Sequence, residues 1–129
     1  MMKVMVVDDY PDHVDTLVSA FSEAGCEVVG ASRGSEALEV CKDFSPDLII
    51  CDGLLPDMKA WQFGYNVLQE SPPVRPYMVA LTGSQSNLQR RLCEECGFDE
   101  YVTKPIDHST LLDWVFKARK PVDGTRNNA

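Results

Sequence analysis

Long hydrophobic runs are missing from this 129-residue sequence. No apolar stretch approaches the roughly 20 residues that a membrane-spanning helix needs. The N-terminus also lacks a basic segment followed by a long apolar one, which is the pattern of a secretory signal. We therefore expect a cytoplasmic protein without a membrane partner. The hydrophobic fraction of 44% is ordinary for a globular chain, and the length has room for one domain with a full core.

Positive charge is scarce, because 12 Lys and Arg residues stand against 20 Asp and Glu residues. The formal net charge is −8 and the pI is about 4.6. A chain with this balance repels phosphate backbones and anionic membranes. We expect no direct contact with nucleic acid, and a cationic cofactor or partner is the more natural complement.

A disulfide framework is also absent. The five cysteines are an odd number and lie mostly in apolar segments, which favours free thiols in a reducing compartment. The run CEEC at 93–96 has the spacing of a metal-binding pair, but no second Cys or His pair accompanies it. Because this run falls in a predicted helix, we expect its cysteines to pack against neighbours. His13 and His108 stand in helix-start contexts and have no feature of a catalytic base.

Short apolar segments of strand length recur at nearly regular spacing, and each is followed by a stretch with helical periodicity. The predicted strands cover 3–7, 27–31, 47–51, 77–81 and 101–103. Strict alternation of strands and helices implies a parallel sheet with right-handed crossovers and helices on both faces. The fold class is therefore doubly wound α/β, with five strands and five helices. We expect the domain to span 1–120, followed by a polar tail over 121–129.

Aromatic side chains widen the apolar surface of the last predicted helix. Trp114 and Phe116 extend it beyond a single stripe. The favoured interpretation is that both rings belong to the core, and the alternative is that part of this surface meets a partner or a second copy.

Polar side chains gather where the predicted strands end. Asp8 and Asp9 follow the first strand, Asp52 follows the third, and Thr82 and Lys104 end the fourth and fifth. Ligands of open parallel sheets bind outside the carboxyl ends of the strands. Three carboxylates brought together there require a cation, and oxygen ligands of this kind suit Mg²⁺. A lysine and a hydroxyl beside them supply what a phosphoryl group needs.

Each of these residues has an ordinary alternative role when taken alone. Asp8 or Asp9 could cap a helix, Thr82 could be a strand residue, and Lys104 could be a solvated charge. It is their occurrence together, at the ends of successive strands, that favours a phosphoryl-transfer site.

Four motifs in order carry a resemblance to a known family. They are VVDD at 6–9, DLIICDGLLP at 47–56, ALTG at 80–83 and YVTKP at 101–105. With these, the chain resembles the receiver domain of two-component response regulators from about Lys3 to Lys117. The resemblance implies the flavodoxin-like strand order 2-1-3-4-5.

The resemblance also implies the chemistry. Asp52 is the expected phosphoacceptor, taking a phosphoryl group from the phosphohistidine of a sensor histidine kinase or a histidine phosphotransfer domain. Mg²⁺, or Mn²⁺, is the expected cofactor, held by Asp8, Asp9, Asp52 and the backbone carbonyl of Leu54. Lys104 and Thr82 are expected to bind the phosphoryl oxygens. No activity on a separate substrate is expected, because such a domain catalyses only its own phosphorylation and dephosphorylation.

A switch and an output surface are implied in the same way. Thr82 would move toward the phosphoryl group, and Tyr101 would turn inward after it; the alternative for Tyr101 is ordinary core packing. The Lys104–Pro105 peptide is expected to be cis. A downstream protein would read the face formed by the fourth helix, the fifth strand and the fifth helix, and phosphorylation-dependent homodimers are possible on such a face.

The sequence departs from the family pattern in the segment after Asp52. Leu55 stands where methionine is usual, and Lys59 and Ala60 stand where an Asp-Gly pair is usual. Leu54 and Ser84 occupy positions that influence hydrolysis of the phosphoaspartate. Because neither side chain is suited to orient an attacking water, we expect slow loss of the phosphoryl group.

Three other functions compete with this interpretation. A phosphatase similar to the haloacid dehalogenase family needs a second aspartate two residues after the nucleophile, where this chain has Leu54. A flavodoxin-like cofactor binder would need a phosphate-binding site, and no glycine-rich phosphate loop is present. A degenerate receiver that binds partners without phosphorylation is the third alternative, and the complete set of Asp, Thr and Lys argues against it. Whether the domain acts alone or within a longer regulator or hybrid kinase stays open.

Overall fold

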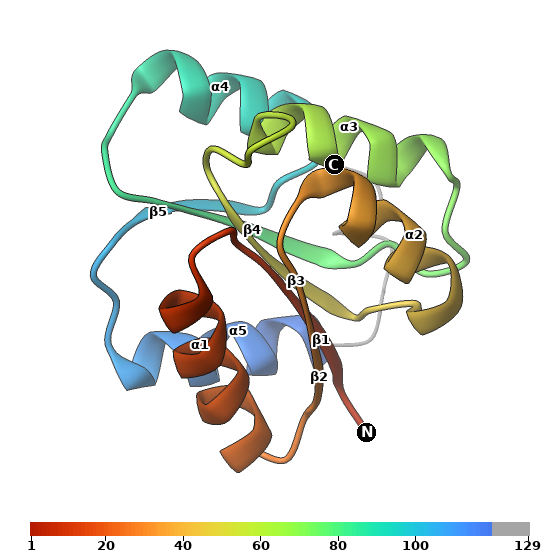
Figure 1. The fold of residues 1–129 in the computed structure, drawn as a ribbon, viewed down its shortest axis with the longest axis vertical. Coiled ribbons are helices and arrows are strands. Elements are labelled where there is room, and N and C mark those ends of the chain that lie inside the picture. The colour runs from red at the N-terminus through yellow and green to blue at the C-terminus, as the bar shows by residue number, and fades with distance from the viewer. Residues whose placement is uncertain (120–129) are drawn as a thin grey trace.

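The computed structural model describes residues 1–119, and in them five strands alternate with five helices (Figure 1). The elements in chain order are β1 Lys3–Val7, α1 Pro11–Glu23, β2 Glu27–Ala31, α2 Gly34–Phe44, β3 Leu48–Asp52, α3 Ala60–Gln69, β4 Tyr77–Thr82, α4 Asn87–Glu95, β5 Glu100–Thr103 and α5 His108–Arg119. The predicted alternation is therefore confirmed, with β3 ending one residue later than expected, on Asp52 itself. The predicted tail at 121–129 lies outside the described residues.

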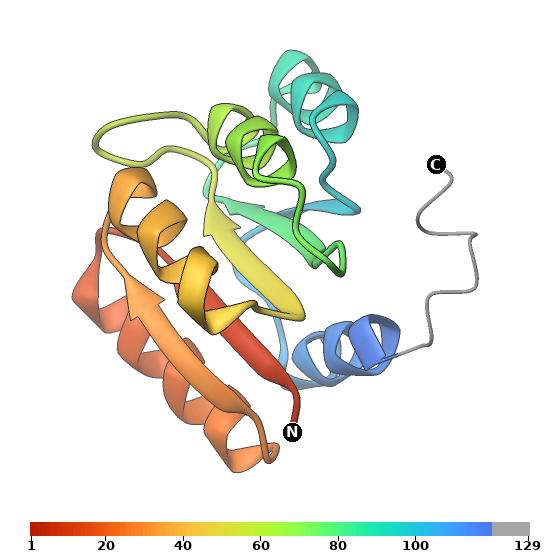
Figure 2. The same cartoon turned by 90° about the vertical axis from the view of Figure 1, so that its right-hand side faces the viewer.

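All five strands pair in parallel in the order β2-β1-β3-β4-β5, which is the order that the resemblance implied. The strand order reverses between β1 and β3, since the chain runs outward to β2 on one side and to β4 and β5 on the other. Helices α1 and α5 cover one face of the sheet and α2, α3 and α4 cover the other (Figures 1 and 2). Ligand sites of this fold lie at the carboxyl edge of that reversal.

The core consists of two hydrophobic layers, one on each side of the sheet. Alternate residues of a strand serve opposite layers, so Met5 and Val7 face one side while Val4 and Val6 face the other. All four are fully buried, as expected for central strands of a doubly covered sheet. The rigid centre fixes the ends of β1 and β3 relative to each other.

The two aromatic rings of α5 have different environments. Trp114 is fully buried, and its indole nitrogen donates to Glu100 Oε1 over 3.2 Å. Phe116 is 61% exposed, so the expectation that both rings belong to the core is wrong for Phe116. The helix turns the two side chains, two residues apart, toward opposite sides.

Membrane-spanning character is missing from the described helices: in residues 1–119 none combines the length and the apolar sequence needed to cross a bilayer.

Candidate functional site

Three carboxylates meet at the carboxyl edge of the sheet. Asp8 and Asp9 follow β1, and Asp52 is the last residue of the neighbouring β3. Each offers one oxygen to a group whose ligand atoms all lie within 4.8 Å of one another. The predicted convergence of these side chains is therefore present, because the parallel pairing of β1 with β3 brings both strand ends to one place.

Asp8 is the most enclosed of the three, with a side chain that is 6% exposed. Its Oδ1 accepts a hydrogen bond of 2.9 Å from the backbone N–H of Tyr10, and its Oδ2 lies 3.4 Å from Lys104 Nζ. Asp9 is exposed to solvent. One carboxylate is thus oriented by the protein, while its neighbour stays open toward a ligand.

Asp52 stands partly buried between a like and an opposite charge. Burial, followed by the negative charge of Asp8, raises the pKa of Asp52, while Lys104 acts in the opposite direction. Lys104 Nζ lies 3.2 Å from Asp52 Oδ1. The ionised form of this carboxylate is therefore less favoured than in water and gains from any further positive charge.

Lys104 reaches both carboxylates from the loop that follows β5. Its backbone N–H donates to the carbonyl of Thr82 over 2.7 Å, which ties this loop to the end of β4. The Lys104–Pro105 peptide is cis, which is the isomer that the family resemblance implied. The ammonium group thereby stands as a single point charge between Asp8 and Asp52.

Thr82 ends β4 next to this group, and its side chain is buried. Its hydroxyl donates to the carbonyl of Ser84 over 3.1 Å and accepts from the Ser84 N–H over 3.3 Å. Gly53, which follows Asp52, leaves room for it, since a Cβ at that position would lie 3.0 Å from Thr82 Cβ and Oγ1. The hydroxyl is therefore placed beside the acidic group but bonded to its own loop.

Leu54 and Tyr101 occupy very different surroundings. Leu54 lies in the loop after β3, where it forms an isolated antiparallel bridge with Lys59, and its side chain is 66% exposed. Tyr101 is buried in the layer that contains α3 and α4, and the Arg90 guanidinium stands 5.0 Å from its ring centre. The aromatic ring is packed in the core in this structure.

His13 is part of the site, although no motif in the sequence predicts its presence there. Its Nδ1 lies 3.2 Å from Asp8 Oδ2 and 3.2 Å from Lys104 Nζ. It stands in the first turn of α1, five residues after Asp8, so its approach depends on the angle at which this helix leaves β1. The only available sequence signal was its position at the start of a helix beside the acidic pair.

The donor set fits a magnesium ion. Asp8, Asp9 and Asp52 provide carboxylate oxygens, and Leu54 follows closely enough in the chain to add a carbonyl oxygen. Hard oxygen ligands from a few carboxylates, with the remaining positions left to water, are what Mg²⁺ takes in proteins. The raised pKa of Asp52 points the same way, because a divalent cation would relieve the repulsion from Asp8.

The CEEC run is not part of a metal site in the described residues. Cys93 is buried in α4 and Cys96 is partly buried at its end. Burial raises the pKa of the Cys93 thiol to about 11, so the metal-binding thiolate is disfavoured. The expectation that these cysteines pack against neighbours is confirmed for Cys93.

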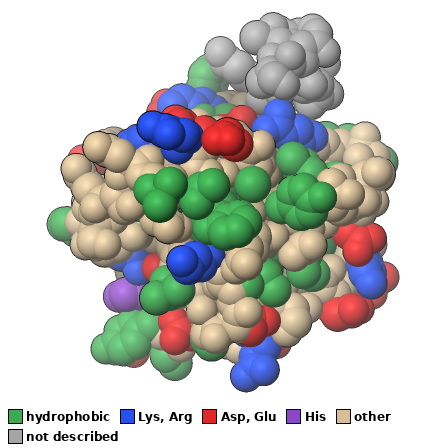
Figure 3. Space-filling view, turned by 90° about the horizontal axis from the view of Figure 1, so that it is seen from above, with side chains coloured by type: hydrophobic (Ala, Val, Ile, Leu, Met, Phe, Trp, Pro, Cys, Tyr) green, Lys and Arg blue, Asp and Glu red, His purple; other side chains and the backbone are tan. Residues whose placement is uncertain are grey.

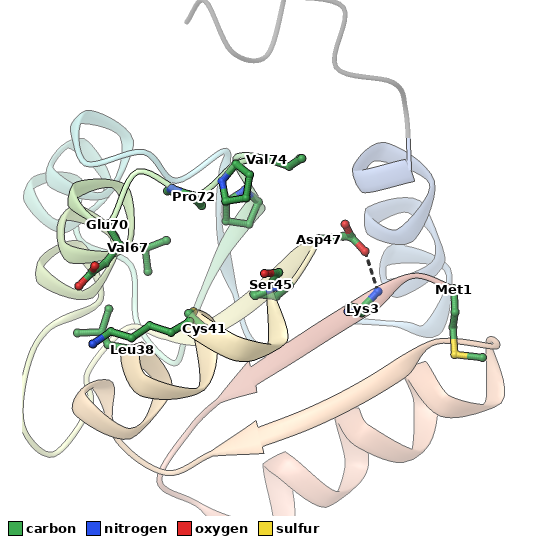
Figure 4. A pocket seen from close by; sticks show the side chains of 14 residues that line it. Met1, Lys3, Leu38, Cys41, Ser45, Asp47, Val67, Glu70, Pro72 and Val74 are labelled. Carbon is green, nitrogen blue, oxygen red and sulfur yellow. Dashed lines mark hydrogen bonds between the residues drawn. The ribbon is translucent and has the colours of Figure 1, made fainter.

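A cavity of about 450 Å³ lies at the other end of the sheet (Figure 4). It is enclosed by the ends of α2 and α3 and by the segment before β4, with Leu38, Val67 and Val74 among its apolar walls. Its charged groups are dispersed, and Asp47 already accepts from the backbone N–H of Lys3. The size of a cavity therefore does not identify the functional site. Phosphoryl chemistry needs the convergent charges at the carboxyl edge of the sheet.

Comparisons with known proteins give a consistent result. The sequence model of the response regulator receiver domain matches residues 4–116. The chain is 28% identical to the protein PilG of Pseudomonas aeruginosa, over 93% of this chain and 88% of that protein. It is 33% identical to the alkaline phosphatase synthesis transcriptional regulatory protein PhoP of Bacillus subtilis, over 81% of this chain and 42% of PhoP. The solved structure of the chemotaxis response regulator CheY4 of Vibrio cholerae is 28% identical, covers 92% of this chain and 98% of that one, and superposes with a TM-score of 0.83.

Proposed function

The chain belongs to the response regulator receiver domains of two-component signalling, and from this premise we propose that it accepts a phosphoryl group on Asp52 from a phosphohistidine. One observation carries the proposal: three carboxylates lie within 4.8 Å of one another, and Lys104 Nζ is 3.2 Å from the Asp52 carboxylate. A nucleophilic oxygen, a cation site and a fixed positive charge at one place are the parts that phosphoryl transfer requires.

In the proposed transfer, an Asp52 carboxylate oxygen forms a bond to phosphorus as the phosphorus–nitrogen bond of the donor histidine breaks. The electron pair of that bond stays on the histidine nitrogen. Lys104 neutralises one phosphoryl oxygen, and the Thr82 hydroxyl leaves the Ser84 carbonyl to donate to another. Mg²⁺, or Mn²⁺, held by Asp8, Asp9, Asp52 and the Leu54 carbonyl, supplies the positive charge that lets anionic groups approach each other.

We also propose that phosphorylation changes the conformation of a surface to which a protein partner binds. Movement of Thr82 changes the end of β4, against which β5 and Tyr101 pack. Apolar side chains are exposed on the helices of the α4–β5–α5 face, where Leu88, Leu112 and Phe116 are 60%, 45% and 61% exposed. In Figure 3 hydrophobic side chains also gather over α3 and α4. Such surface suits a downstream protein or a second phosphorylated copy.

The proposed role is that of a cytoplasmic signalling module rather than an enzyme acting on separate substrates. All five cysteines are free thiols, which fits a reducing compartment. The chain spans 88% of PilG but only 42% of PhoP. The negative net charge of −8 speaks against direct binding to nucleic acid.

Transfer from a phosphohistidine donor tests the proposal. A purified histidine phosphotransfer domain, labelled with ³²P on its histidine, is mixed with the chain in the presence of Mg²⁺. We expect label to move to the chain in the unaltered protein and not in Asp52→Asn. The matched control is Asp43→Asn, an exposed carboxylate of α2 remote from the site. Failure of every such donor, with acetyl phosphate also inactive, would contradict a phosphoacceptor role.

A further inference from the structure

The carboxylate of Asp57 joins the loop after β3 to the first turn of α2. Its Oδ1 accepts from the backbone N–H of Gly34 over 2.8 Å, and its Oδ2 accepts from the N–H of Ser35 over 2.9 Å. Both oxygens thus accept from the first two residues of α2, which precede Asp57 by 23 and 22 residues. We call this pair of hydrogen bonds the Asp57 clamp.

The first turn of α2 has no cap of its own. Its N-cap residue is Arg33, which makes no capping hydrogen bond with its side chain. The first N–H groups of a helix lack intrahelical partners and carry the positive end of the helix dipole. A carboxylate supplied from the distant loop satisfies two of these groups. These hydrogen bonds, that of Ser35 first, lower the pKa of Asp57.

Beside the clamp, an apolar side chain also packs the loop after β3 against the first turn of α2. Gly34 has no Cβ, and one placed there would clash with Met58 Sδ. The Met58 side chain therefore rests directly on the backbone of α2, next to the hydrogen bonds of Asp57. Polar and apolar contacts join the same two segments at adjacent residues.

The loop is also closed on itself. The Leu55 N–H donates to the Met58 carbonyl over 2.9 Å, and the Ala60 N–H donates to the Gly53 carbonyl over 3.1 Å. Together with the Leu54–Lys59 bridge, these bonds leave the segment little freedom between Asp52 and α3. A displacement of Asp57 would therefore also displace Leu54, three residues earlier in the chain.

From these contacts we infer that Asp57 is a positioning residue for the metal site. By anchoring the loop after β3 to α2, Asp57 holds the Leu54 carbonyl in place. The inference rests on the proposed function, since it concerns the loop that would contribute to the Mg²⁺ site. Helix α2 would thereby help to position the metal site, although none of its side chains belongs to the acidic group. The Asp57 carboxylate is not one of the three that form the acidic group.

Coupling of this kind acts in both directions. If the closed clamp favours Mg²⁺ binding by some factor, bound Mg²⁺ must favour the closed clamp by the same factor. Mg²⁺ should therefore slow hydrogen exchange of the Gly34 and Ser35 amides, which open when the clamp breaks. A residue that merely stabilised α2 would show no such response.

Three variants and one matched control test the inference. Asp57→Ala removes the clamp, and Asp57→Asn keeps one oxygen that can accept. Asp107→Ala is the control, because Asp107 likewise caps a helix, accepting from the Thr110 N–H over 3.0 Å, but on α5 and without contact to the loop. The third variant, Asp52→Asn, shows which Mg²⁺ binding belongs to the acidic group. Mg²⁺ affinity is followed by NMR titration, and amide exchange is measured with and without saturating Mg²⁺.

We expect Asp57→Ala to weaken Mg²⁺ binding about tenfold. This is the low end of the loss seen when a residue that holds a metal ligand in place is removed. Asp57→Asn should lie between it and the unaltered protein, and Asp107→Ala should bind as the unaltered protein does. Saturating Mg²⁺ should slow exchange at Gly34 and Ser35 by a similar factor and leave Thr110 unchanged.

Equal Mg²⁺ affinity in Asp57→Ala and Asp107→Ala would overturn the inference, as would equal protection of the Gly34 and Thr110 amides by Mg²⁺. Both comparisons are made on folded protein, which the spectra report directly. Absence of both Mg²⁺ binding and phosphoryl uptake in the unaltered protein would instead refute the proposed function, and the inference would fall with it. Binding and uptake in the unaltered protein without an effect of Asp57→Ala would overturn the inference alone.

Discussion

Single residues at the carboxyl edge of the sheet carry opposing electrostatic effects. Burial and the neighbouring Asp8 raise the pKa of Asp52, so its ionised form is disfavoured in the folded chain relative to the unfolded one. The folded state then binds more protons than the unfolded state above the ordinary Asp pKa of 3.8, and stability falls as pH rises through this range. Asp52 therefore destabilises the metal-free protein at neutral pH.

Asp52→Asn is accordingly expected to stabilise the metal-free protein at pH 7, by about 1 kcal/mol, as relief of repulsion at functional sites often does. The measurement is urea unfolding in the presence of EDTA between pH 4 and pH 7. The advantage of the variant should grow with pH over this interval. A difference that is absent, or that does not depend on pH, would contradict the charge argument.

Asp57 has the opposite sign of pH dependence. Hydrogen bonds from the Ser35 and Gly34 amides lower its pKa below 3.8 in the folded state. Its contribution to stability is therefore complete above pH 3.8 and is lost as pH falls through the lowered pKa. We expect acid to destabilise the unaltered protein more steeply than Asp57→Asn between pH 4 and pH 2. Unfolding curves of the two proteins that keep a constant separation would exclude this contribution.

Gly53 has a role that follows from the position of Thr82. A Cβ at Gly53 would lie 3.0 Å from Thr82 Cβ and Oγ1, so Gly53→Ala should displace the hydroxyl and cost about 1 kcal/mol of stability through overpacking. Phosphorylation by acetyl phosphate should slow as well. Gly83→Ala is the matched control, since a Cβ there meets nothing within 4 Å. Equal rates and stabilities in the two variants would show that Thr82 is not confined by Gly53.

Most side chains of the site could be predicted from the sequence because they end strands. Asp8, Asp9, Asp52, Thr82 and Lys104 needed only the strand pattern and the rule for parallel sheets. His13 could not be predicted, because its distance of 3.2 Å to Asp8 depends on the departure angle of α1 and on side-chain conformation. Neither of these has a periodic signature in the chain.

At the scale of elements, α3 shows packing overruling helix propensity. Gly64 lowers the intrinsic stability of this helix by about 1 kcal/mol relative to alanine. A Cβ there would nevertheless lie 2.6 Å from Phe98 Cε2 and 3.1 Å from the Cys96 carbonyl. The glycine thus allows α3 to approach the end of α4 and the segment that leads into β5.

Gly64→Ala is expected to destabilise the protein by about 1 to 3 kcal/mol, the usual cost of overpacking a core. Asn66→Ala on the same helix is the control, because it raises helix propensity at a partly exposed position without an overpacked contact. Thermal unfolding compares the two. A Gly64→Ala protein more stable than the unaltered one would mean that propensity, rather than the contact with Phe98, governs this helix.

The bounds of the strands and helices could be predicted to within a few residues, but the contacts by which one element stabilises another could not. Alternating apolar and amphipathic segments sufficed to locate β1, β3 and β4. The start of α2 is different, since its capping group comes from Asp57, at least 22 residues later and in another motif. A local sequence rule for helix starts looks for a cap beside the helix and cannot find one supplied across space.

At the scale of the whole molecule, topology does most of the functional positioning. The order β2-β1-β3-β4-β5 brings the ends of β1 and β3 together at the strand reversal and adds Thr82 and Lys104 from β4 and the loop after β5. Strict alternation of strands and helices made a parallel, doubly covered sheet predictable. The position of the 450 Å³ cavity, away from the acidic group, was not predictable, because this cavity is formed by loops at the opposite edge of the sheet.

The most direct test of the account is the intact mass of the chain after incubation with acetyl phosphate and Mg²⁺, beside Asp52→Asn and a sample containing EDTA. We expect the gain of one phosphoryl group in the unaltered protein, and no gain in the variant or without the metal. An unaltered mass, or the same gain in Asp52→Asn, would contradict the assignment of Asp52 as the phosphoacceptor.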